Sequence, residues 1–187
     1  MERGHSSLIM HLSVRELQHS DIAHIVRYWL ESGDAHMRGM GVDLEKMPNQ
    51  EAWTQMLNAQ LKAPLHEKQA YCMVWLMDNK PVGHCNINMI QQGVEAHMDL
   101  HLWHADSRKK GAGTQFVKLT LPHFFKAYDL QRIICQPYAR NPAANKTLEK
   151  VGFTFVKEYL AIPGFLNFEQ PVKQWVFEVD RLSQLDK

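Results

Sequence analysis

A short basic segment in the second half of the chain has residue types suited to binding phosphate. It stands between a strand-like run, 98–103, and an amphipathic run, 115–128, and reads Arg108, Lys109, Lys110, Gly111, Ala112, Gly113 and Thr114. Glycine lets a ligand approach closely, and the first N–H groups of a helix point at an anion. The spacing is neither that of a P-loop nor that of a dinucleotide fingerprint. The segment therefore predicts either another kind of phosphate site or a solvated turn that caps a helix.

A second motif follows beyond another strand-like run. It reads Asn141, Pro142, Ala143, Ala144, Asn145, Lys146, Thr147, Leu148, Glu149, Lys150, Val151, Gly152 and Phe153. Together the two motifs resemble the signatures of the GNAT superfamily of N-acetyltransferases. These are an R/Q-x-x-G-x-G/A loop for coenzyme A, and an asparagine followed by a helix that ends in K-x-G-F. The resemblance covers residues 73–156 well, the N-terminal third only in outline, and looks most like the branch acting on protein N-termini and related amines.

This resemblance implies an α/β (α+β) fold, a mixed, mostly antiparallel central sheet of six or seven strands with helices on both faces, in one domain over residues 1–187. It implies an enzyme that moves an acetyl group from acetyl-CoA to a primary amine of a small molecule or a peptide. The 108–114 loop would hold the cofactor's phosphates, with Thr114 as a hydroxyl donor, and Asn141 would contact its pantetheine arm. The family's backbone donors to the thioester carbonyl fall at Leu102 and Trp103. Lys146 is either a further phosphate contact or a solvated lysine.

The two usual catalytic side chains of the family are replaced here. Many members carry a tyrosine acid seven residues after the signature asparagine, where this chain has Leu148. Many of the N-terminal branch carry a glutamate base five residues before it, where this chain has Gln136. Either other residues act, with Tyr138 a candidate acid, or positioning alone lowers the barrier. A second hypothesis is a coenzyme A-binding sensor or scaffold that has lost transfer activity.

Polar and apolar residues alternate along a hairpin expected over residues 83–103. The polar positions are His84, Asn86 and Asn88 on one strand, and His97, Asp99 and His101 on the other. A two-residue turn at 92–93 would place these residues opposite one another on one face, because a shift of one residue would bury polar groups among apolar ones. The face predicts a wet cleft, a self-satisfied polar ladder, or simply a solvent-exposed sheet face.

If this face lines the acceptor pocket, His101 is the candidate base, since imidazole has an unperturbed pKa of about 6.5. Asp99, roughly 7 Å back along the strand, would attract the positive charge of the substrate. His84 and Asn86 would contact the substrate, and His84 would compete with His101 for its proton. The same histidine and aspartate leave open a hydroxylamine or siderophore-type acetyltransferase.

Composition limits other partners. A formal net charge of +1 argues against nucleic acid, and no apolar run of about 18 residues predicts a membrane span. The three cysteines lie in strand-like runs, which favours buried thiols in a reducing compartment and hence the cytoplasm. The 11 histidines lack a spacing that sets several ligands on one element, so no metal is expected. We expect a monomer or a homodimer.

The remaining elements follow from periodicity and breakers. Strands are expected at 8–17, 71–77, 81–90, 94–103, 133–137, 153–162 and 172–180, and helices at 20–31, 50–62, from 113, and between Asn141 and a C-cap at Gly152. The strand at 133–137 should be parallel to its predecessor if the helix between them is a crossover. Pro122 is expected to kink or end the third helix near Leu121. The stretch 32–48 is either a mobile surface link or a substrate lid.

Overall fold

The computed structural model describes residues 10–104, 106 and 111–185. Its strands form one seven-stranded sheet in the order β1-β2-β3-β4-β5-β7-β6. Neighbouring strands are antiparallel except β4 and β5, which are parallel. The strands are β1 Leu12–Glu16, β2 Ala70–Met77, β3 Lys80–Gln91, β4 Glu95–Leu102, β5 Arg132–Cys135, β6 Thr154–Ala161 and β7 Gln170–Glu178. The mixed, mostly antiparallel sheet expected from the sequence is confirmed.

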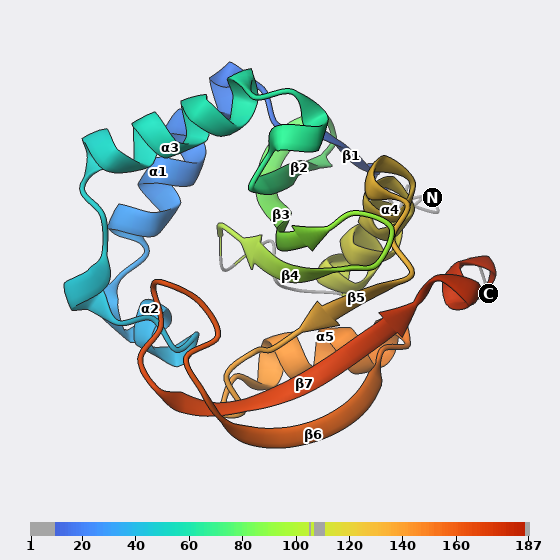
Figure 1. Cartoon of the computed structure of the whole chain (residues 1–187). Helices are drawn as coiled ribbons and strands as arrows, with labels where there is room; N and C mark the ends of the chain where they lie inside the picture. Colours follow the sequence, from blue (N-terminus) through green and yellow to red (C-terminus); the bar gives the residue numbers. More distant parts are fainter. Residues whose placement is uncertain (1–9, 105, 107–110, 186–187) are drawn as a thin grey trace, which may run out of the picture.

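Helices cover both faces of this sheet, with α1 and α3 side by side on one face and α4 and α5 on the other (Figure 1). Among the described residues, no helix is long and apolar enough to cross a membrane. The helices are α1 Ile22–Glu31, α2 Asp34–Gly39, α3 Gln50–Lys62, α4 Ala112–Tyr128 and α5 Pro142–Val151. Short 3-10 turns lie at η1 His19–Asp21, η2 Leu44–Lys46, η3 Leu65–Glu67 and η5 Val179–Gln184.

Each face of the sheet has its own apolar core. On the α4 side, the rings of Trp75 and Phe116 stack with their centroids 5.0 Å apart, and both side chains are fully buried. Cys85 and Ile87 of β3 point into this same core. Because side chains alternate along a strand, the residues between them face α1 and α3. The polar residues of the β3–β4 hairpin therefore lie on the α1 side.

Pro122 does not end α4, so that part of the sequence prediction is wrong. The helix continues to Tyr128 although proline removes one backbone hydrogen bond. A proline inside a helix costs about 3 kcal/mol. Phe124, Phe125 and Tyr128 all lie in the core beyond it, and their burial holds the last turns in place.

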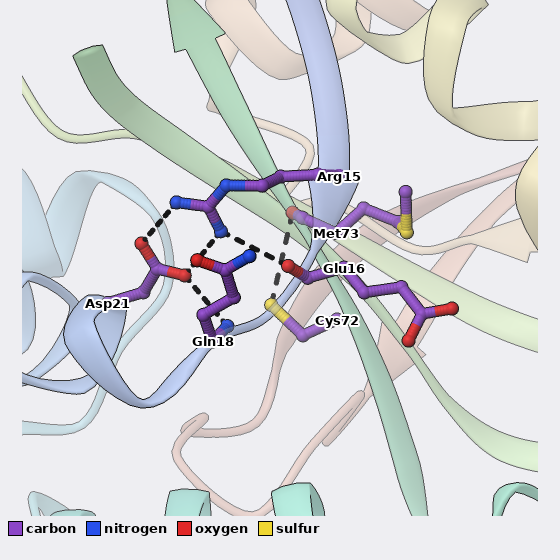
Figure 2. A network of polar contacts seen from close by, with 6 residues as sticks. All are labelled: Arg15, Glu16, Gln18, Asp21, Cys72 and Met73. Atoms are coloured by element: carbon purple, nitrogen blue, oxygen red, sulfur yellow. Dashed lines mark hydrogen bonds and ion pairs between the residues drawn. The ribbon is translucent and has the colours of Figure 1, made fainter. Parts of the chain in front are cut away.

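A partly buried ion pair fixes the start of α1 against β1 (Figure 2). Both oxygens of the Asp21 carboxylate accept from the Arg15 guanidinium, at 2.6 and 3.0 Å, and one also accepts from the Gln18 N–H at 2.8 Å. Asp21 is fully buried, so removing its partner would leave an uncompensated charge. The pair sets the direction in which α1 leaves the sheet edge.

The stretch 32–48 is ordered rather than a mobile link. It forms α2 and η2, and Met37 is buried beneath it. Val42 makes a β-bridge to Asn167, and the Asp43 N–H donates to the Leu166 carbonyl at 2.7 Å. The stretch is thus tied to the loop between β6 and β7, which lies beside α2 (Figure 1).

Candidate active site

The polar residues of the hairpin are paired as the alternation predicts. His84 lies opposite His101, and the two other predicted pairs also form. The predicted two-residue turn is wrong, because Gln91 pairs with Glu95 across a three-residue turn. An irregularity in β3, where Met89 takes a positive φ of 48°, absorbs the extra residue. The register in the middle of the hairpin is therefore the same.

All six polar side chains line a cavity of about 820 Å³, and we call them the cavity floor: His84, Asn86, Asn88, His97, Asp99 and His101. Apolar side chains from α1, α3 and the β6–β7 loop form much of the wall. These include Ile25, Trp29, Trp53, Met56, Leu57, Phe165 and Leu166. The structure thus favours the cleft over the solvent-exposed sheet face.

His84 is a buried, neutral histidine. Its Nδ1 accepts from the indole N–H of Trp103 at 2.8 Å, so the neutral ring carries its proton on Nε2. Burial lowers the pKa of His84 to about 3. Its ring stacks on His101 at a centroid distance of 4.8 Å. His84 therefore supports the ring of His101 and does not compete with it for a proton near neutral pH.

His101 is partly exposed, at the cavity end of β4. Its Nδ1 lies 3.2 Å from the hydroxyl of Tyr28, which lies 3.2 Å from Nε2 of His36 as well. The indole of Trp29 meets the His101 ring edge-on, with centroids 4.9 Å apart. The ring is thus held by contacts on several sides.

Asp99 is the carboxylate of the cavity floor. One oxygen accepts from Nδ2 of Asn88 at 2.8 Å, and Asn86 also donates to the carboxylate. Asp99 is exposed, but it faces the cavity, and the surrounding protein raises the pKa of its carboxyl. Asn86, predicted to contact substrate, thus contacts Asp99. Asn88 shares this role, which the sequence interpretation did not give it.

β4 and β5 pair over only a short distance. Their described register ends at His97 opposite Ile134. The Trp103 N–H donates to the Val82 carbonyl at 2.9 Å, so in this conformation it belongs to the sheet. The role of Trp103 at the cofactor stays a prediction. Because hydrogen bonding alternates along a strand, the backbone of Leu102 faces the β5 side. Beyond the pair of His97 and Ile134 the two strands are no longer paired, and we call the space between them the gap. Met98 of β4 and Gln136, which follows β5, both line the cavity.

The start of α4 lies beside this gap. Gly111 precedes the helix with a φ of 75°, and a Cβ at Gly111 would meet nothing within 4 Å. A Cβ at Gly113 would lie 3.6 Å from Leu102 and 3.8 Å from Thr147, so the ends of β4, α4 and α5 meet here. Thr114 is partly exposed and Ala112 is buried. The predicted cations Arg108, Lys109 and Lys110 lie outside the described residues.

Asn141 and Asn145 organise the start of α5. The Asn141 side chain caps the helix by accepting from the Ala144 N–H at 3.3 Å. Asn145, which sequence reasoning missed, is buried. It donates to the carbonyls of Tyr138 and Asn141 and accepts from the Trp175 indole at 2.9 Å. Asn145 thereby ties α5 to β7 and to the segment after β5.

The positions of the family's usual acid and base have other roles here. Leu148 is fully buried in the core, and Gln136 donates to the hydroxyl of Tyr159. Tyr138 lines the cavity and packs edge-on against Phe168. Lys146 is exposed on α5. Of these residues, Tyr138 alone combines a titratable hydroxyl with a place in the cavity wall.

The cysteines take no part in the chemistry we assign. Cys72, Cys85 and Cys135 are free and buried, as expected from the sequence. Burial raises the pKa of each thiol, and a protonated thiol is a poor nucleophile. Among the described residues, no cluster of histidine, cysteine and acidic side chains could hold a metal ion.

β4 and β5 pair over a short length, and Gly111 and the start of α4 lie beside the gap that follows. This arrangement offers a place for an extended cofactor with phosphates at one end. The model of the GNAT acetyltransferase domain matches residues 11–154. The chain belongs to the GNAT acetyltransferase family. Enzymes of this family use acetyl-CoA. The open space at Gly111 and the helix N-terminus that follows it fit its phosphates.

Solved GNAT structures share the fold. Ribosomal-protein-S5-alanine acetyltransferase from Vibrio fischeri is 22% identical, with a TM-score of 0.74 over 91% of this chain and 94% of that chain. RimL, a ribosomal L7/L12 alpha-N-protein acetyltransferase in complex with coenzyme A, is 17% identical, with a TM-score of 0.73 over 90% and 94%. Aminoglycoside acetyltransferase AAC(6')-Ib with coenzyme A and kanamycin is 16% identical, with a TM-score of 0.73 over 95% and 100%. No curated protein sequence matches the chain.

Proposed function

We propose that this enzyme transfers the acetyl group of acetyl-CoA to a primary amine bound in the cavity, with His101 as the base. One observation carries the proposal. His101 lines the cavity, and the backbone of the next residue, Leu102, points to the β5 side of β4, beyond the last β4–β5 pair. The acceptor side and the cofactor side of the reaction would then meet at consecutive residues of one strand.

Two parts of the chain would hold the cofactor. The α4 N-terminus, with Gly111 and the three cationic residues that precede it in the sequence, would bind the phosphates, because helix-start N–H groups favour anions. The backbone of β4 at Leu102 would meet the thioester carbonyl. Bound acetyl-CoA supplies the acetyl group as a thioester, which an amine can attack only in its neutral form.

The residues of the cavity floor would prepare the amine. Asp99 attracts the ammonium group, and His101 takes one of its protons. The neutral nitrogen then forms a bond to the carbonyl carbon, and the bond from that carbon to sulfur breaks. The thiolate takes a proton from an acid, and the second proton that the nitrogen loses as the amide forms restores that acid through solvent. Tyr138, on the wall of the cavity, is the candidate acid. The amide product carries no positive charge and loses its attraction to Asp99.

Release of free thiol tests this proposal. The purified chain is incubated with acetyl-CoA and a panel of amines, and thiol formation is followed together with the mass of the acceptor. We expect thiol release that depends on the amine and an acceptor heavier by one acetyl group. A chain that binds acetyl-CoA in calorimetry, yet releases no thiol with any amine, would overturn transfer and favour the sensor hypothesis.

A further inference from the structure

A row of aromatic side chains leads from the outer wall of the cavity to His101. Phe165, in the β6–β7 loop, is 65% exposed and packs on Trp53 of α3 with centroids 6.3 Å apart. Trp53 stacks on Trp29 of α1 at 5.2 Å with nearly parallel planes. Trp29 then meets His101 edge-on at 4.9 Å. We call Phe165, Trp53 and Trp29 the aromatic wall.

Negative charge, in contrast, is scarce in this cavity. Of the described residues that line it, Asp99 and Glu67 carry carboxylates. The Glu67 side chain is 63% exposed and lies 3.5 Å from His66. The ammonium of Lys68, also on the lining, donates to the carbonyls of Gln60 and Leu61. Asp99 is therefore the carboxylate of the cavity floor that is positioned to meet a positive charge beside His101.

This balance of charge and apolar surface selects among amines. A cation removed from water needs a counter-charge, and an unpaired one is costly to bury. A molecule with several ammonium groups would leave most of them unpaired against the aromatic wall. A molecule with one ammonium group would pair it with Asp99 and bury its remaining surface against Trp29, Trp53 and Phe165.

We propose that the acceptor is a primary amine with a single positive charge on an apolar body, aromatic or long alkyl. Its nitrogen lies between Asp99 and His101, and its body lies along the aromatic wall. This inference rests on the proposed function and narrows its substrate class. Such an amine could be a free small molecule or the N-terminus of a peptide that begins with a bulky apolar residue. The chemistry recognised is the same in both.

The test compares amines of different charge and polarity. We measure kcat/KM by thiol release from acetyl-CoA with five acceptors. They are phenethylamine, octylamine, spermidine, kanamycin and a short neutral peptide that begins with phenylalanine. We expect the apolar monoamines, or the peptide, to exceed spermidine and kanamycin by about tenfold or more, the order of selectivity that apolar contacts supply. A higher kcat/KM for the peptide than for the free monoamines would identify the acceptor as a peptide N-terminus. A higher kcat/KM for the free monoamines would identify it as a small molecule.

A matched pair of variants tests the wall itself. Phe165→Ala removes an exposed ring from the cavity lining, whereas Leu160→Ala removes an exposed side chain of β6, 68% exposed, that does not line it. We expect Phe165→Ala to lower kcat/KM for phenethylamine by about tenfold and to leave spermidine unaffected. Leu160→Ala should change neither value.

Two results separate failure of this inference from failure of transfer. If spermidine or kanamycin reacts best, transfer stands and the acceptor class is overturned. If no amine releases thiol, calorimetry with the same amines decides the class, since binding does not require chemistry. Tighter binding of phenethylamine than of spermidine would then support the inference, and the reverse order would overturn it.

Discussion

The indole N–H of Trp103 lies 2.8 Å from Nδ1 of His84, and both side chains are buried. The bond leaves the neutral His84 ring with its proton on Nε2. The Trp103 ring also stacks on His24, with centroids 5.6 Å apart. Trp103, predicted to contact the cofactor, thus positions a histidine. His84, predicted to contact substrate, is largely closed off, with 3% of its surface exposed.

This buried histidine should make stability depend on pH. The pKa of His84 falls from its ordinary 6.5 to about 3 in the folded protein. Below pH 6.5 His84 binds a proton in the unfolded chain but stays neutral in the folded protein. The free energy of unfolding therefore decreases as the pH falls toward 3. The loss from this one group is about 1.4 kcal/mol per pH unit. Urea denaturation of wild type and His84→Gln at several pH values should show a shallower decline in the variant. Equal slopes would mean that His84 is protonated in the folded state.

Gly111 and Gly93 offer a matched test of the cofactor loop. Both have a positive φ, 75° and 76°, and a Cβ at either would meet nothing within 4 Å. Valine at either position would therefore cause similar backbone strain, about 1–2 kcal/mol. Gly111→Val should abolish acetyl-CoA binding in calorimetry, because the new side chain occupies the approach of the phosphates. Gly93→Val, in the β3–β4 turn, should bind normally. Equal affinities of the two variants would refute the assignment of the loop.

Asn145 should matter more for stability than Asn141. Asn141→Ala removes a helix cap, which costs about 1 kcal/mol, and weakens acetyl-CoA affinity if Asn141 contacts the pantetheine arm. Asn145→Ala leaves the buried Trp175 indole without its acceptor. It also removes one of the two donors to each of the carbonyls of Tyr138 and Asn141, which keep their backbone donors. Each buried unsatisfied group costs about 1–3 kcal/mol. Chemical denaturation should therefore show the larger loss for Asn145→Ala, and a smaller loss would show that water replaces its bonds.

The sequence predicted well what depends on local pattern. The strict alternation from His84 to His101 determined the hairpin register even though the turn between the strands was wrong, because a buried face penalises any slip. Gly152 was predicted as the α5 C-cap, and it has the expected left-handed backbone, with a φ of 105°.

The missed features depend on contacts between distant parts of the chain. Tyr28 and His101 are 73 residues apart, and Asn145 bonds to an indole 30 residues away. The prediction that the helix ends near Pro122 came from local propensity. Burial of the residues that follow Pro122 in the core overrides that propensity. A polar residue on a helix gives no local sign of whether it caps, contacts a ligand or bridges strands.

His101→Ala is the direct test of the base. We expect turnover to fall by about 10²-fold or more, the usual contribution of a general base. Affinity for acetyl-CoA should remain nearly constant, and the acidic limb of the pH–rate profile should disappear. His123→Ala, an exposed histidine of α4, serves as the control and should leave all three unchanged. Turnover within about threefold of wild type, far short of that loss, would make the polar floor structural.

Tyr28→Phe tests how a proton leaves His101. The Tyr28 hydroxyl lies 3.2 Å from both His101 Nδ1 and His36 Nε2, and His36 is partly exposed. The hydroxyl can therefore pass a proton from the cavity toward the surface, and it also orients the imidazole. Phenylalanine keeps the packing of the ring and removes this link. We expect kcat to fall by roughly tenfold, less than the loss of the base itself, with KM and acetyl-CoA affinity unchanged. Tyr128→Phe removes a hydroxyl bound to the Leu65 carbonyl and should leave kcat unchanged. Equal kcat values for both variants would show that His101 exchanges its proton with water in the cavity.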